Sequence, residues 1–60
     1  MKEKLNKSLA EIQAHPDVYR RMWSVELMGE VIEGMYEILC TGLYLYYKNG
    51  ELFLTDQEEG

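Results

Sequence analysis

The chain has 60 residues, a net charge of −5 and a pI of about 4.6, because eleven aspartates and glutamates outnumber six lysines and arginines. This balance is the opposite of the basic patch with which proteins hold phosphate backbones. No 18-residue stretch is free of charge, and no apolar run follows the charged N-terminus. We therefore expect no membrane span and no signal peptide, and a cytoplasmic protein with a reduced Cys40.

The small size predicts association. A domain of this length buries only about 60% of the surface that its unfolded chain exposes, and usually needs a disulfide, a metal or a partner chain. One cysteine cannot form an intrachain disulfide, and Cys40 with the single histidine, His15, cannot supply the four ligands of a usual structural zinc site. We expect no metal and no cofactor, and either a homodimer or a chain bound to another protein.

The first predicted element is a helix over residues 2–14. Leu5, Leu9 and Ile12 follow one another at i, i+4 and i+7, which is the narrow apolar stripe of an amphipathic helix. The helix should end near Ala14, because a residue that precedes proline avoids the α region. Pro16 suits the first position of the next helix.

The second predicted element is a long helix over residues 16–40. Its apolar residues recur with a helical period and cover nearly half of the cylinder. Opposite them lies a stripe of glutamates at i, i+4, i+7 and i+11, which is either a solvated face or an acidic docking stripe: Glu26, Glu30, Glu33 and Glu37. A helix of 25 residues would be roughly 37 Å long, which favours packing against a second copy.

The third predicted element is a β-hairpin with strands over residues 43–47 and 51–55. Asn49-Gly50 lies between two β-prone runs and suits a type I′ turn, which needs positive φ at both central residues. This turn would place Tyr46 opposite Phe53, on an aromatic face that also includes Tyr44. The aliphatic face of the hairpin should cover the helices, and residues 56–60 should form a frayed tail.

No catalytic constellation is predicted. Nothing in the spacing brings Cys40 and His15 together as a nucleophile and its base, and Cys40 at the end of an apolar helix is expected to be a small buried hydrophobe. The glutamates lie opposite the apolar arc without the histidines of a carboxylate metal site. We therefore expect a protein that is not an enzyme.

These elements predict one α+β domain over residues 1–60, in the order ααββ, completed by homodimerisation. The leading hypothesis is a small acidic protein-interaction module, an adaptor or inhibitor that modulates a larger cytoplasmic protein, as many small bacterial and phage regulators do. Its expected anchors are aromatic, as in most protein interfaces: Tyr44, Tyr46, Phe53 and Trp23. A stacking platform for single-stranded nucleic acid is the weaker interpretation, because only Lys48 would supply a cation there.

Two other hypotheses remain open. The acidic stripe of Glu26, Glu30, Glu33 and Glu37 could imitate nucleic acid and block a protein that binds DNA or RNA. Two helices and a hairpin superficially resemble a winged helix-turn-helix, which suggests a DNA-binding transcription regulator. Direct binding to DNA is disfavoured, because the second helix would present glutamate where base edges require Lys, Arg, Asn or Gln.

Overall fold

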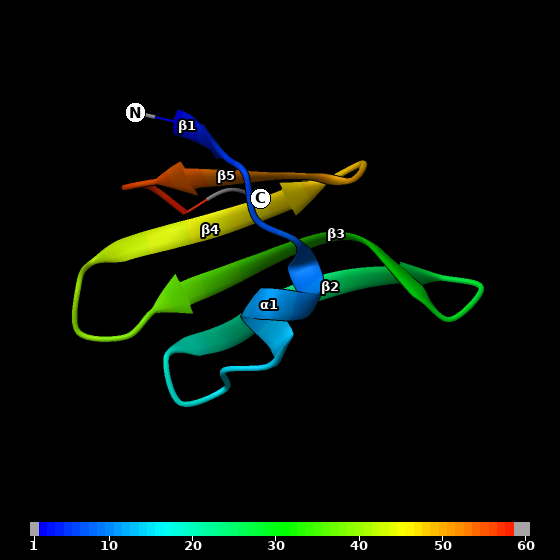
Figure 1. Ribbon diagram of the computed structural model, residues 1–60, viewed down its shortest axis with the longest axis horizontal. Coiled ribbons are helices and arrows are strands. Elements are labelled where there is room, and N and C mark those ends of the chain that lie inside the picture. The colour runs from blue at the N-terminus through cyan, green and yellow to red at the C-terminus, as the bar shows by residue number, and fades with distance from the viewer. Residues whose placement is uncertain (1, 59–60) are drawn as a thin grey trace.

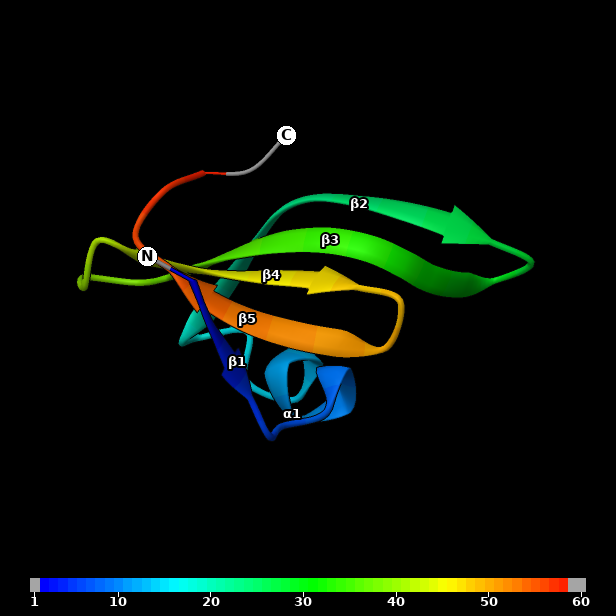
Figure 2. The same ribbon diagram turned by 90° about the horizontal axis from the view of Figure 1, so that it is seen from above.

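The computed structural model describes residues 2–58 and consists of a five-stranded sheet with one short helix. All neighbouring strands are antiparallel, and their order across the sheet is β1-β5-β4-β3-β2. The helix lies on one face of this sheet (Figures 1 and 2). In chain order the elements are β1 (Lys2–Leu5), α1 (Leu9–Gln13), β2 (Tyr19–Leu27), β3 (Glu30–Ile38), β4 (Leu43–Lys48) and β5 (Glu51–Thr55).

The predicted α+β fold with two helices is wrong. The segment expected as a helix over residues 2–14 contains β1 and the five-residue α1, while the segment expected as a helix over residues 16–40 is the β2–β3 hairpin. The described chain has no helix long and apolar enough to cross a membrane. The fold is therefore mainly β, and its hydrophobic pattern has to be understood on strands.

The β2–β3 hairpin turns at Met28-Gly29. Both residues have positive φ, 54° and 81°, as a two-residue type I′ turn requires. On β3, Glu33 and Met35 alternate with Gly34 and Tyr36, so neighbouring residues point to opposite sides of the sheet. Both sides are partly apolar, and such a strand lacks the simple apolar–polar alternation that distinguishes it from a helix.

The β4–β5 pairing has the register that Asn49-Gly50 predicts, including Tyr46 opposite Phe53 and Lys48 opposite Glu51. Asn49 and Gly50 have φ values of 52° and 81°. The hairpin does not cover two helices as predicted, because it belongs to a larger sheet: β1 pairs with one side of it and β3 with the other. Both strands of the hairpin thus lie inside the sheet, and neither is an edge strand.

The core lies between α1 and the sheet. Four buried residues form it: Ile12, Tyr36, Leu45 and Leu52. Ile12 is the one described residue of α1 that is fully buried, and it meets residues of three neighbouring strands. The Tyr36 ring also covers Gly34, where a Cβ atom would stand 3.4 Å from Tyr36 Cε1.

Cys40 is exposed, so its predicted burial is wrong. It lies in the turn between β3 and β4 with a φ of 66°, and not at the end of a buried helix. In the same turn the Thr41 hydroxyl donates to the Ile38 carbonyl at 2.7 Å and accepts from the Leu43 amide at 3.1 Å. Of the expected tail, residues 56–58 are exposed, and residues 59 and 60 lie outside the described chain.

Candidate functional site: the open face of the sheet

The face of the sheet opposite α1 carries the candidate site. Leu45, Leu52 and Tyr36 point toward α1, so the residues that alternate with them point to the other side, which we call the open face. The strand register arranges its side chains in three rows. The aromatic row is Lys4, Phe53, Tyr46, Met35 and Trp23, the basic row is Lys2, Thr55, Tyr44, Glu37 and Arg20, and the acidic row is Glu51, Lys48, Glu33 and Val25.

The structure brings the four sequence-predicted aromatic anchors together on this face. Trp23, Tyr44, Tyr46 and Phe53 come from β2, β4 and β5, and each is half-buried. The ring centroids of Trp23 and Tyr46 lie 6.3 Å apart at an interplanar angle of 60°. Met35 occupies the position between these two in the aromatic row and is 0% exposed. The centre of the open face is therefore apolar, with Met35 fully buried beneath the surface.

Cations reach this face from strands that the sequence pattern had placed in helices. Lys2 Nζ lies 5.3 Å from the centroid of the Tyr46 ring, a cation–π distance. Lys4 Nζ lies 2.9 Å from Glu51 Oε2. Arg20 donates from Nε and Nη2 to Glu37 Oε1, at 3.0 and 2.8 Å.

The open face is close to electrically neutral, unlike the whole chain. Its three rows hold four basic side chains and three acidic ones, against six and eleven in the chain. The Tyr46 hydroxyl donates a hydrogen bond to Glu33 Oε2, which joins the aromatic and acidic rows. An apolar centre with a polar margin is the usual anatomy of a protein interface.

The predicted acidic stripe does not form, because the four glutamates are on strands. Glu33 and Glu37 belong to different rows of the open face and bind Tyr46 and Arg20, respectively. Glu26 and Glu30 lie beside the exposed β2–β3 turn. The absence of a second helix also leaves no recognition helix for the winged-helix hypothesis in the described chain.

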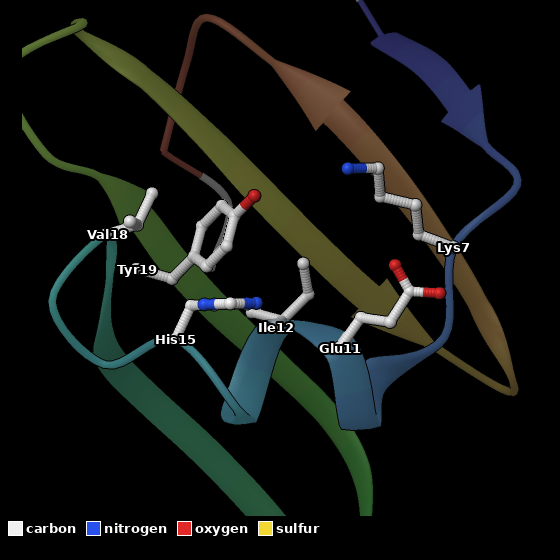
Figure 3. A pocket seen from close by; sticks show the side chains of 6 residues that line it. All are labelled: Lys7, Glu11, Ile12, His15, Val18 and Tyr19. Atoms are coloured by element: carbon white, nitrogen blue, oxygen red, sulfur yellow. The ribbon is translucent and has the colours of Figure 1, made fainter.

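Shallow hollows flank the sheet, and two of them contain residues discussed above. One, of about 340 Å³, lies on the open face among Lys2, Tyr46, Lys48, Asn49, Glu51 and Phe53. The other, of about 270 Å³, lies on the α1 side, where the ring of Tyr19 stands over Ile12 while Lys7 and Glu11 lie at one end and His15 at the other (Figure 3). His15 lines this second hollow but Cys40 does not. The structure therefore does not bring Cys40 and His15 together there as a nucleophile and its base.

Within residues 2–58, no three His, Cys, Asp or Glu side chains gather as a metal site would require. Large exposed apolar side chains are concentrated instead near the β2–β3 turn. Four lie there, Val25, Leu27, Met28 and Ile32, with Met28 92% exposed, and two others, Val18 and Leu39, lie elsewhere in the described chain. This turn extends beyond the end of β4 in both views (Figures 1 and 2).

Sequence reasoning missed the contributions of Lys2, Lys4, Arg20 and Met35 to the open face. Arg20 and Met35 could have been placed on this face if Met28-Gly29 had been recognised as the turn of a hairpin. Met-Gly is, however, a weaker hairpin signal than Asn-Gly. Lys2 and Lys4 carry no such local signal, because β1 reaches the face only by pairing with β5.

Comparison of the chain with models of known protein families, with curated proteins and with solved structures found no match.

Proposed function

We propose that this chain is a non-catalytic protein-interaction module whose open face binds a polypeptide. In this proposal it is an adaptor or inhibitor that modulates a larger protein in the cytoplasm. One observation supports the proposal most strongly: four half-buried aromatic residues from three strands lie on the face that α1 leaves uncovered. Aromatic side chains at the centre of an interface contribute much of its binding energy.

The polar margin of the open face supports a protein partner over a nucleic acid. A stacking platform needs a cationic groove along the strand that it binds. Here Lys4 and Arg20 are engaged by Glu51 and Glu37, and Glu33 stands beside Tyr46. A phosphate backbone would meet these three carboxylates, whereas the mixed charges of a protein surface can complement them.

The cytoplasmic part of the proposal is supported by Cys40. The chain has a single cysteine, and its thiol is exposed. Such a thiol is compatible with the reducing conditions under which disulfides are rare.

The proposal is tested by site-specific photo-crosslinking. Tyr44→p-benzoylphenylalanine places a crosslinker on the open face, and Gln13→p-benzoylphenylalanine places one on exposed α1 as the matched control. In lysate of the source cells, we expect the variant at position 44 to form a discrete product with a polypeptide and the variant at position 13 to form none. Equal labelling at both positions, or no product at position 44, would contradict the proposal.

A further inference from the structure

We propose that the outer edge of β2 pairs with the same edge of a second copy, antiparallel, about a two-fold axis through Ser24. The two sheets then join into one, with the open faces of both copies on the same side. The inference concerns the edge of the sheet and not its open face, so it does not depend on the proposed function.

β2 is the more accessible of the two edge strands. Among residues 2–58 no strand pairs with its outer side, and it has nine residues against four in β1, the other edge. Three of the four β1 residues are charged, which is a common way to prevent an edge from pairing. The outer N–H and C=O groups of an edge strand can pair with another strand, so β2 is the edge at which this is favoured.

The turn of the β2–β3 hairpin determines which β2 residues turn their backbone outward. In a hairpin with a two-residue turn, the residues before and after the turn exchange both backbone hydrogen bonds. Leu27 therefore faces β3, and alternation along the strand turns the N–H and C=O groups of Glu26 and Ser24 outward. Met22 is an extra residue on β2, so the alternation shifts there and the backbone of Arg21 also faces outward.

Two of these outward residues carry opposite charges on either side of Ser24. Arg21 and Glu26 are both exposed, and neither forms an ion pair within residues 2–58. Arg21 is opposite Tyr36, which points toward α1. Glu26 follows Val25, which is on the open face, so the Glu26 side chain also points to the α1 side. The cation and the carboxylate therefore lie on the same side of the sheet.

A two-fold axis through Ser24, perpendicular to the sheet, pairs these charges. Ser24 lies three residues from Arg21 and two from Glu26, and the extra residue Met22 accounts for the difference. Arg21 of each copy then lies beside Glu26 of the other, at outward backbone positions that can exchange hydrogen bonds. Opposite charges across two strands stabilise their pairing and like charges destabilise it. An in-register parallel pairing would place Arg21 beside Arg21, so the charges favour the antiparallel one.

The same pairing covers part of the exposed apolar surface near the β2–β3 turn. Val25 and Leu27 are 45% and 60% exposed and lie on the open-face side of β2. In the pairing about Ser24, Val25 lies beside Trp23 of the other copy, which buries apolar surface of both side chains. A seam of one strand pair is smaller than a standard interface, so we expect a monomer–dimer equilibrium at micromolar to millimolar concentration.

Charge reversal on the two sides of Ser24 tests the arrangement. Arg21→Glu places two carboxylates together and Glu26→Arg places two guanidinium groups together, so each variant alone should associate about tenfold more weakly, since the change acts twice in a symmetric dimer. An equimolar mixture of the two should associate again, because both pairs then have opposite charges. Glu30→Arg is the matched control for Glu26→Arg: Glu30 is exposed but lies on β3, away from the edge, so association should change little.

Sedimentation equilibrium of the full chain from 10 µM to 1 mM measures these outcomes, and hydrogen exchange followed by NMR locates the contact. The amides of Ser24 and Glu26 should exchange several-fold more slowly at 1 mM than at 50 µM, because the dimer gives them acceptors. A wild-type chain that is monomeric throughout, a mixture that does not recover, an equal loss in the control, or exchange of these amides that ignores concentration overturns the inference. A monomeric chain that still forms a crosslink from position 44 to a different protein would overturn the edge dimer and leave the proposed function standing.

Discussion

At the scale of single residues, the two hairpin turns have the same backbone conformation although their sequences differ. Asn49-Gly50 and Met28-Gly29 have nearly the same backbone, with φ of 52° and 54° at the first position. Asparagine tolerates this left-handed region because its short side chain bonds locally, whereas most L-residues lose about 1–2 kcal/mol there. Met28 therefore occupies a conformation that its own chemistry does not favour.

We predict that Met28→Asn stabilises the chain. Met28 is 92% exposed, so little packing is lost, and relief of the strained turn should contribute about 0.5–1 kcal/mol. For a domain of this size the melting temperature should rise by roughly 2–8 °C in thermal unfolding followed by circular dichroism. The reciprocal change Asn49→Met should lower it, and a fall with Met28→Asn would show that the Met28 side chain contributes a stabilising contact.

At the scale of elements, α1 depends on one capping hydrogen bond and one buried side chain. The Ser8 hydroxyl caps its first turn by accepting from the Glu11 amide at 3.4 Å, and Ile12 fixes it to the sheet. A helix of five residues is far too short to persist alone, so its stability comes from this docking. Ile12 is 1% exposed and lies against Tyr36, Leu45 and Leu52.

We predict that Ile12→Ala unfolds a large part of the population. Truncation of a fully buried isoleucine costs about 2–5 kcal/mol, which is comparable to the whole stability of many small domains. Urea unfolding followed by tryptophan fluorescence measures the loss, and Gln13→Ala, on the exposed side of α1, is the control and should change stability by less than about 0.5 kcal/mol. A native-like midpoint in Ile12→Ala would mean that α1 does not close the core.

The elements also show why sequence reasoning succeeded for one hairpin and failed for the other. In β4–β5, Asn49-Gly50 specifies turn and register locally, so the common face of Tyr44, Tyr46 and Phe53 could be predicted before the fold was known. In β2–β3, the glutamates at 26, 30, 33 and 37 imitate a helical period, and Met28-Gly29 is a weak turn signal.

The β2–β3 hairpin was mistaken for a helix for a physical reason, which also left residues of the open face unplaced. Two register shifts in its pairing, after Arg21 and after Val25, interrupt the strand period that would have opposed the helical interpretation. Trp23 was predicted as an anchor, but its neighbour Met35 could be placed only once the two strands were paired. The position of β1 depends on pairing with β5 some fifty residues away, which no local pattern encodes.

At the scale of the whole molecule, α1 packs on one side of the sheet only (Figure 2). Four residues form the core between α1 and the sheet, while Met35 and Thr55 are buried on the open side. A 60-residue domain buries a smaller share of its surface than a larger one, so its stability is marginal without a partner. A second copy bound to this chain would add apolar burial that the single chain lacks.

We therefore predict that the melting temperature of the wild-type chain depends on its concentration. Dimerisation that occurs only in the folded state stabilises it by mass action, in proportion to the logarithm of the concentration above the dissociation constant. Between 5 and 500 µM the melting temperature should rise by several degrees in differential scanning calorimetry. A wild-type melting temperature that stays constant over this range would mean that self-association adds nothing to the stability of the fold.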